Sequence, residues 1–282
     1  MSGRRVPHMS RQRLITRRVA LKDMGKAGLA VVVFGAACTS EDGTGTTLPG
    51  STTLPPSDTT TSLATTTTDN PSPSSAPGGP SQWARVNMGF VSAYILYREG
   101  EAALVDTGQS GAEGDIEAAL QTIGLDWGAV TSVIVTHRHP DHAGSVVAVA
   151  GLAPNSSIYA GAGDIDAIGP IESAGGTREP IAVGDDDSVF GLDIIETPGH
   201  TVGHISVLDA AAGILVTGDA MNTNGGTLNS ASADPQFTRD PAQADESVRK
   251  LAGFDYDVIL VGHGEPITEG GAEAVSALAA DL

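Results

Sequence analysis

From residue 92 onward, hydrophobic residues occur in short runs that glycine and polar segments separate. Short runs rich in Val and Ile are typical of β-strands that are buried on both faces. We expect strands at residues 92–97, 102–105, 132–135, 156–160, 181–183, 192–196, 205–208, 213–216 and 258–261. The first two should pair around the polar segment 98–101, and 205–208 should form a hairpin with 213–216.

Segments with helical spacing alternate with these strands. Ile116, Ala119, Leu120 and Ile123 recur at helical intervals, which predicts a helix over 112–123. We also expect helices at 143–150, at 240–252, where Asp240-Pro241 provides a start, and at 271–280. The alternation of strands and helices predicts a domain of the α/β class over residues 83–282.

The first 82 residues have a different pattern and do not predict a globular fold. A basic segment precedes the short apolar run 27–37, which is too short to span a bilayer as an ordinary helix. This order is typical of an export signal, which we place at residues 1–38. Arg17-Arg18 and their neighbours resemble a twin-arginine signal, although Ala20 stands where a bulky apolar residue is usual.

Cys38 is the only cysteine, and it directly follows the apolar run. This position resembles a bacterial lipoprotein signal, in which the cysteine is lipidated; the alternative is ordinary cleavage near Ala37. Residues 39–82 are dominated by Thr, Ser, Pro and Gly and predict a disordered linker. We therefore expect an exported protein, either tethered to the cell surface by a lipid or secreted.

The charge of the chain narrows the range of partners. The formal net charge is −19, and residues 83–282 carry 7 Lys and Arg against 29 Asp and Glu, which makes −22. Such a surface repels nucleic acid, so we expect a small-molecule substrate and membrane contact only through the lipid anchor. The single cysteine excludes a disulfide within the chain and a cysteine ligand in the domain.

A dense group of metal-ligating residues follows the strand predicted at 132–135. His137, His139, Asp141 and His142 fall within six residues. In an extended chain His137 and His139 point the same way, and Pro140 then starts a helix that carries the other two. Neutral imidazole and carboxylate suit zinc and similar first-row metals, which indicates a metal site.

Three further candidates lie after other predicted strands. His200, Asp219 and His263 each follow an apolar run and each have a glycine beside them. Glycine allows the sharp turns that a loop needs where the backbone closely approaches another group. Five histidines and two aspartates at strand ends are enough ligands for two metals that share a bridge.

Together these segments resemble the metallo-β-lactamase-fold hydrolase superfamily, in particular its glyoxalase II, lactonase and subclass B3 branches. The matching segments, in the order of that family, are 104–108 (Leu-Val-Asp-Thr-Gly), 137–142 (His-Arg-His-Pro-Asp-His), 197–201 (Thr-Pro-Gly-His-Thr), 217–219 (Thr-Gly-Asp) and 262–264 (Gly-His-Gly). The resemblance implies a four-layer αββα sandwich whose metals lie at one edge.

The resemblance also implies a role for each ligand. His137, His139 and His200 would hold the first metal, Asp141, His142 and His263 would hold the second, and Asp219 would bridge both. The expected cofactors are two divalent cations, zinc first, with iron or manganese as alternatives. A hydroxide between the metals would attack an ester, thioester, lactone or amide carbonyl, and Asp141 would orient it or pass a proton to the leaving group.

Two further residues are expected beside the ligands rather than among them. Asp106 either accepts the imidazole N–H of a metal-bound histidine or is a turn residue before Thr107-Gly108. His204 begins a predicted strand four residues after His200, which favours a structural or ligand-orienting role over a place in the metal shell.

The sequence does not select one substrate. Only 19 residues follow His263, which argues against the helical domain of glyoxalase II and its glutathione thioester. His139 stands where oxygen-reducing diiron relatives have a glutamate. The alternatives left open are a mononuclear iron persulfide dioxygenase and, in another class, a non-catalytic protein that binds metal or ligand at a surface.

Overall fold

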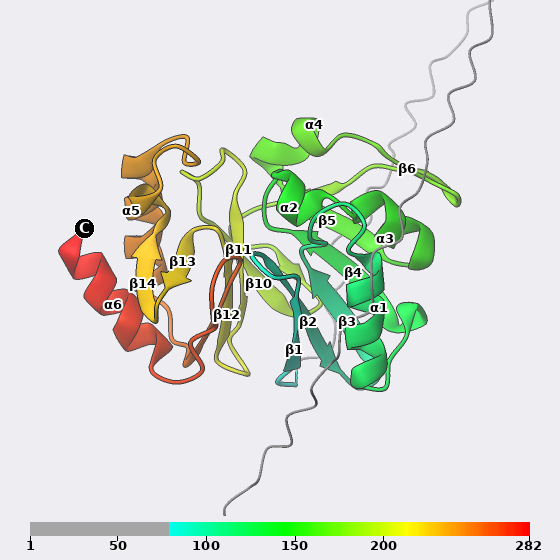
Figure 1. Ribbon diagram of the computed structural model, residues 1–282, viewed down its shortest axis with the longest axis horizontal. Helices are drawn as coiled ribbons and strands as arrows, with labels where there is room; N and C mark the ends of the chain where they lie inside the picture. The colour runs from blue at the N-terminus through cyan, green and yellow to red at the C-terminus, as the bar shows by residue number, and fades with distance from the viewer. Residues whose placement is uncertain (1–78) are drawn as a thin grey trace, which may run out of the picture. The chain divides into compact units, whose positions relative to one another are not determined.

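The computed structural model describes residues 79–282. The export signal predicted at 1–38, with Cys38, and most of the linker predicted at 39–82 lie outside the described residues. In the part that is described, no helix is both long and apolar enough to cross a bilayer. Two β-sheets lie at the centre of this part, with helices on their outer sides (Figure 1).

The first sheet has six strands and mixed topology. Its strands, in spatial order, are β1 (Gln82–Asn87), β2 (Ser92–Arg98), β3 (Glu101–Val105), β4 (Val130–Val135), β5 (Ser157–Gly161) and β8 (Ile181–Val183). The first three are antiparallel, as predicted for 92–97 and 102–105, and β3, β4, β5 and β8 run parallel to one another. Therefore β3 and β4 end at the same edge.

The second sheet has five strands. In spatial order they are β15 (Val258–Val261), β12 (Ile214–Gly218), β11 (Ile205–Asp209), β10 (Leu192–Glu196) and β9 (Ser188–Val189). The predicted β11–β12 hairpin is confirmed. Because β11 is antiparallel to both β10 and β12, and β15 is parallel to β12, the strands β10, β12 and β15 end at one common edge.

Helices cover both sheets on the outside (Figure 1). The elements outside the two sheets are α1 (Glu113–Thr122), η1 (Trp127–Ala129), α2 (Pro140–Ala143), α3 (Val146–Leu152), η2 (Ala162–Asp164), α4 (Ile165–Ile168), β6 (Ile171–Ser173), β7 (Gly176–Arg178), β13 (Met221–Asn224), β14 (Thr227–Ser230), η3 (Ala231–Ala233), α5 (Pro241–Leu251) and α6 (Gly271–Asp281). Helices α1 and α3 pack on the first sheet, and α5 and α6 pack on the second.

Three hydrophobic cores separate the four layers. On β4, Val133 and Val135 face α1 and α3, whereas Ile134 between them faces the second sheet. On β12, Val216 faces the first sheet and Leu215 faces α5 and α6. Alternate residues of a strand point to opposite faces, so strands covered on both sides are continuously apolar. The predicted α/β sandwich is confirmed.

Three local expectations were incomplete or wrong. The helix predicted at 143–150 is instead two short helices, α2 and α3, separated at 144–145. There a Cβ on Gly144 would overlap the backbone of residues 140 and 110. Strand β1 was not predicted. The β13–β14 hairpin, which spans residues 221–230, was not predicted either.

Candidate metal centre

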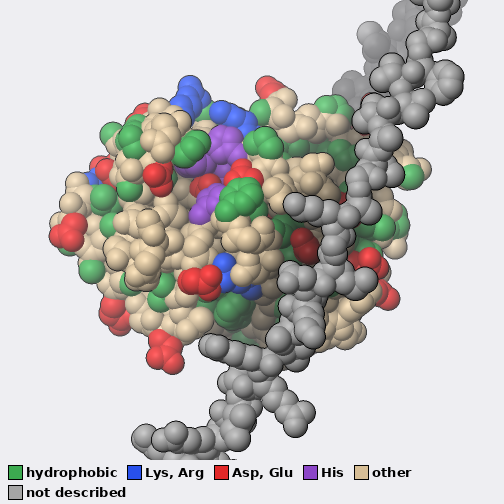
Figure 2. Space-filling view, viewed as in Figure 1, with side chains coloured by type: hydrophobic (Ala, Val, Ile, Leu, Met, Phe, Trp, Pro, Cys, Tyr) green, Lys and Arg blue, Asp and Glu red, His purple; other side chains and the backbone are tan. Residues whose placement is uncertain are grey.

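Loops and the short helix α2 at one edge of the sandwich carry all seven predicted metal ligands. His137 and His139 follow β4, and Asp141 and His142 lie in α2, which comes next in the chain. The remaining three follow strands of the second sheet: His200 comes after β10, Asp219 after β12 and His263 after β15. Figure 2 shows histidine side chains gathered on one face with acidic side chains beside them. The centre is therefore built from both sheets.

The first group of ligand atoms consists of three imidazole nitrogens. His139 Nδ1 lies 3.1 Å from His137 Nε2 and 2.9 Å from His200 Nε2. Three nitrogens that share a tetrahedral zinc ion at ~2.0–2.1 Å stand about 3.3 Å apart. The spacing of this group is thus close to that of three ligands around one cation.

The second group combines a carboxylate with two imidazoles. His142 Nε2 lies 3.4 Å from His263 Nε2, and Asp141 Oδ2 lies 3.3 Å from His263 Nε2 and 3.9 Å from His142 Nε2. Each of the two groups offers three donor atoms within 4.8 Å of one another. The division between them is the one that the family resemblance implied.

Asp219 lies between the two groups. Its Oδ2 is 3.4 Å from His200 Nε2 and 3.2 Å from His263 Nε2, and its Oδ1 is 3.3 Å from His142 Nε2. Oδ1 is buried and accepts no hydrogen bond from any described residue. A buried carboxylate oxygen without a partner is costly, and a cation on each side would satisfy it. The donor set therefore fits a pair of divalent cations.

Asp106 and Thr136 orient two of the imidazoles from behind. His142 Nδ1 donates to Asp106 Oδ2 at 2.7 Å. The Thr136 hydroxyl donates its only proton to the same oxygen at 2.9 Å, so its Oγ1 can only accept from His137 Nδ1, 3.1 Å away. Both rings then carry their proton on Nδ1 and direct the lone pair of Nε2 into the centre. Asp106 thus does more than shape a turn, although its φ of 64° is in the left-handed region.

A backbone oxygen and a hydroxyl oxygen orient two more imidazoles, those of His263 and His200. His263 Nδ1 donates to the carbonyl of Phe90 at 2.7 Å. The Thr238 hydroxyl donates to the carbonyl of Ala231, which leaves its Oγ1 to accept from His200 Nδ1 at 3.4 Å. These partners also leave Nε2 of each ring free to bind a metal. The sequence has no signal for the role of the Phe90 carbonyl or for that of the Thr238 hydroxyl.

His204 lies outside the ligand groups and positions Asp219 instead. Its Nε2 accepts the backbone N–H of Asp219 at 3.0 Å, so its proton is on Nδ1 and is donated to Thr197 Oγ1 at 2.8 Å. Thr197 in turn contacts Ser206 Oγ at 2.9 Å. Burial, together with the nearby His200, lowers the pKa of His204 to about 3, so the ring is neutral.

Two glycines allow the backbone to approach the ligands closely. Gly218 has a φ of 49°, and a Cβ there would lie 2.7 Å from Thr136 Oγ1 and 2.8 Å from His204 Nε2. A Cβ on Gly262 would overlap Asp219 Oδ1 and lie 2.7 Å from His142 Cε1. Only hydrogen fits at both positions, which explains why glycine precedes Asp219 and His263.

Burial and charge act in opposite directions on the ligand histidines. Burial lowers the pKa of His200 to about 4 and holds that of His137 well below its usual range. Burial also opposes protonation of His263 and His142. However, Asp141 and Asp219 outweigh it and raise the pKa of His263 to about 10, and Asp219 and Asp106 raise that of His142. The centre thus concentrates negative charge that a cation would neutralise.

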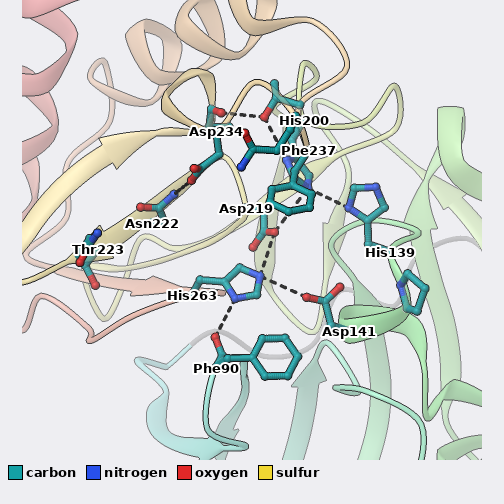
Figure 3. A pocket seen from close by; sticks show the side chains of 15 residues that line it. Phe90, His139, Asp141, His200, Asp219, Asn222, Thr223, Asp234, Phe237 and His263 are labelled. Carbon is teal, nitrogen blue, oxygen red and sulfur yellow. Dashed lines mark hydrogen bonds and ion pairs between the residues drawn. The ribbon is translucent and has the colours of Figure 1, made fainter.

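A cavity of about 750 Å³ opens over this centre. Its wall comprises Phe90, His139, Pro140, Asp141, His200, Asp219, Asn222, Thr223, Asn224, Ala231, Asp234, Gln236, Phe237, Thr238 and His263. Figure 3 shows Phe90 and Phe237 on either side of the His263 ring, and both phenylalanines are largely exposed. The cavity is large enough for a small molecule that reaches the ligand atoms.

The sequence and this geometry agree with a family comparison. The model of the metallo-beta-lactamase superfamily matches residues 86–263, which include all seven ligand candidates. The chain belongs to the metallo-beta-lactamase superfamily. Its His and Asp cluster is accordingly a divalent-metal site. The resemblance noted in the sequence is confirmed at the level of the superfamily.

Curated relatives of this metallo-beta-lactamase superfamily member include hydroxyacylglutathione hydrolases. That of Cereibacter sphaeroides is 31% identical over 166 residues, which make up 58% of this chain and 58% of the relative. The uncharacterized protein YobT of Bacillus subtilis is 27% identical over 197 residues, or 62% of this chain and 83% of the relative. The chain spans less than two thirds of the length of the hydroxyacylglutathione hydrolases it matches.

Solved structures share the fold. A metallo-beta-lactamase family protein from Thermus thermophilus superimposes with a TM-score of 0.54 at 24% identity, covering 71% of this chain and 78% of that one. Metallo-beta-lactamase SMB-1, in a complex with mercaptoacetic acid, gives a TM-score of 0.55 at 20% identity, covering 74% and 95%. Such distant likeness defines the fold alone.

Proposed function

We propose that this chain is a dinuclear metal-dependent hydrolase, with zinc as the metal, that cleaves an ester, thioester, lactone or amide bond. The observation that carries the proposal is the Asp219 carboxylate, which lies between two complete three-ligand groups. Relatives named as hydroxyacylglutathione hydrolases support hydrolysis as the reaction class.

The residues of the centre would have different roles in such a reaction. When bound, divalent cations at this site would lower the pKa of water from ~15.7 toward ~7 and polarise a carbonyl. Asp219 fixes the spacing of the two ligand groups, and His204 fixes Asp219 by accepting its backbone N–H. In both ligand groups, hydrogen bonds at the imidazole Nδ1 atoms, on the side away from the centre, hold histidine ligands in place. Little reorganisation is therefore needed during the reaction.

Asp141 is the residue best placed to move a proton. Its side chain is 27% exposed and lines the cavity, in contrast to the nearly buried Asp219. Without a bound cation, a hydrogen bond from His263 lowers the pKa of the Asp141 carboxyl, and a cation bound at His263 Nε2 would act in the same direction. A carboxylate there can orient the attacking water or pass a proton to the leaving group.

The proposal is tested by metal analysis joined to a broad substrate panel. Purified protein should contain two zinc ions per chain and hydrolyse at least one of a set of esters, thioesters, lactones and β-lactams. The His137→Ala variant should lose the first metal and nearly all turnover. An extended dialysis against a chelator should abolish activity, and zinc should restore it.

Three outcomes would contradict the proposal. Full turnover by His137→Ala would show that the first ligand group is not required. One iron per chain with oxygen uptake would instead identify a persulfide dioxygenase. Metal-loaded protein that is inert toward the whole panel would support a non-catalytic binding protein.

We also propose that the enzyme is exported and is tethered through Cys38. The basis is the order of a basic segment, an apolar run and Cys38 in residues 1–38, followed by the Thr- and Ser-rich linker. Fractionation of a bacterial host should place the full chain in the membrane fraction and the Cys38→Ala variant in the soluble exported fraction. Cytoplasmic retention of both would contradict export.

A further inference from the structure

A buried carboxylate outside the ligand set joins the two loops that hold the first ligand group. Asp164 ends η2, directly after β5, and its side chain is completely buried. Its Oδ2 accepts the backbone N–H of Arg138 at 3.0 Å and the hydroxyl of Thr201 at 2.6 Å. Its Oδ1 accepts the Arg138 guanidinium at 3.0 Å and the backbone N–H of Gly203 at 3.1 Å. All four donors belong to ligand loops.

The residues that donate these hydrogen bonds are neighbours of the ligands in the chain. Arg138 stands between His137 and His139 in the chain, and Thr201 directly follows His200. The Arg138 loop leaves the first sheet, whereas the Thr201 loop leaves the second. The hydrogen bonds of one side chain therefore span the boundary between the sheets at the point where three imidazoles have to meet.

The backbone is packed closely enough for one carboxylate to reach both loops. A Cβ on Gly161 would overlap the carbonyl oxygen of Gly203, and a Cβ on Gly203 would overlap the backbone nitrogen of Asp164. A Cβ on Gly163 would lie 2.9 Å from the nitrogen of Gly203. Side chains at these three positions would force the loops apart, so their glycines serve the same contact.

We propose that Asp164 is a positioning residue for the first metal, and that it acts by locking the two loops that carry His137, His139 and His200. The inference rests on the proposed function, since it assumes that these histidines bind one cation. Asp164 touches no ligand directly, and its effect passes through Arg138 and Thr201.

The second ligand group depends on different supports. His142 is held by Asp106, and His263 is held by the carbonyl of Phe90. Neither support contacts Asp164. Loss of the Asp164 carboxylate should therefore weaken the first metal position and leave the second nearly intact. A general loss of stability would not discriminate between the two positions.

The test is a zinc titration of apoprotein against a competing chelator, made on the wild type and on Asp164→Asn. Asparagine keeps the shape but turns an NH2 group toward two of the four donors. We expect the affinity of one position to fall by about tenfold or more and that of the other to stay within error. In cobalt-substituted protein, the absorption bands of one of the two ions should change and the other bands should persist.

Asp209→Asn is the matched control. Asp209 is also buried, at 1% exposure, and accepts two backbone N–H groups, from Ser81 and Ala212. It ends β11, which runs opposite to β10 and β12 and so ends at the edge away from the metal centre. This variant should lose stability without changing either zinc affinity.

The outcomes separate the inference from the proposed function. A wild type that binds fewer than two zinc ions would refute the function itself. A wild type that binds two, with unchanged affinities in Asp164→Asn and stability lowered as in Asp209→Asn, would overturn the positioning role alone. If Asp164→Asn does not fold, Thr201→Val should weaken the first position and Thr201→Ser should restore it, and equal affinities in that pair would overturn the inference.

Discussion

Replacement of Gly262 by alanine would test how tightly the bridge between the ligand groups is packed. The added Cβ would overlap Asp219 Oδ1 and lie 2.7 Å from His142 Cε1. Ordinary contacts between non-bonded carbon atoms are ~3.5–4.0 Å, so at least one of these groups has to move by about 1 Å. The φ of Gly262 is not in the left-handed region, so the effect would come from contact and not from backbone strain.

The size of the effect follows from this displacement. Inserting a methyl group into a packed interior costs about 1–3 kcal/mol, and we expect the free energy of unfolding to fall by that amount. A 1 Å displacement of catalytic groups can lower turnover by about 10²-fold. We therefore expect kcat/KM for the best substrate of the panel to fall about 100-fold, with weaker binding of at least one zinc ion.

Chemical denaturation, zinc titration and steady-state kinetics measure the three quantities. The control is Gly114→Ala, which makes the same chemical change in α1, where no atom lies within 4 Å of the new Cβ. That variant should be as active as the wild type. Its free energy of unfolding should rise by about 0.5–1 kcal/mol. Wild-type zinc affinity and turnover in Gly262→Ala would refute the close packing of the bridge against Gly262.

Three further predictions concern the supports of the centre and its cavity. His204→Ala leaves the backbone N–H of Asp219 without its acceptor, so the free energy of unfolding should fall by about 1–3 kcal/mol and the turnover number should also fall. A variant as stable and as active as the wild type would show that this hydrogen bond is dispensable. Asp106→Asn removes the carboxylate that accepts the hydrogen bond of His142 Nδ1, so zinc titration should show about 10–100-fold weaker binding at the second position. A change confined to the first position would contradict the assignment of His142 to the second. Among the described residues of the cavity wall, Asp234 is the acidic side chain that is not a metal ligand, and no Lys or Arg lies beside it in that wall. Asp234→Asn should therefore raise kcat/KM for a p-nitrophenyl ester with a carboxylate on the acyl chain more than for its neutral counterpart, and equal changes for the pair would show that Asp234 does not select by charge.

The strongest sequence signals correspond to the best-packed elements. Strands such as β4 and β12 are covered on both faces. Their continuous runs of Val, Ile and Leu predicted them from the sequence alone. The hairpin β13–β14 was missed because its strands consist largely of Asn, Thr and Ser. Gly225-Gly226 between them is a turn signal that could have revealed it.

The supports of the metal centre were harder to foresee than its ligands. Asp164 follows a predicted strand and a glycine, the same pattern that drew attention to Asp219. What distinguishes the two is which loops they face, and that depends on how the sheets pack. The carbonyl of Phe90 and the hydroxyl of Thr238 carry no sequence signal, because almost any loop contains such groups.

The sequence by itself determined the layered α/β fold, the seven ligand candidates and the family, because hydrophobic periodicity and clustered histidines are local properties of the chain. Only the tertiary structure decided which nitrogen of each histidine faces the centre, that the carbonyl of Phe90 supports His263, and that Asp164 joins two loops. Those features depend on the approach of segments far apart in sequence, such as His142 and His263, within 3.4 Å. Such proximity arises only when the ends of strands from two sheets meet at one edge.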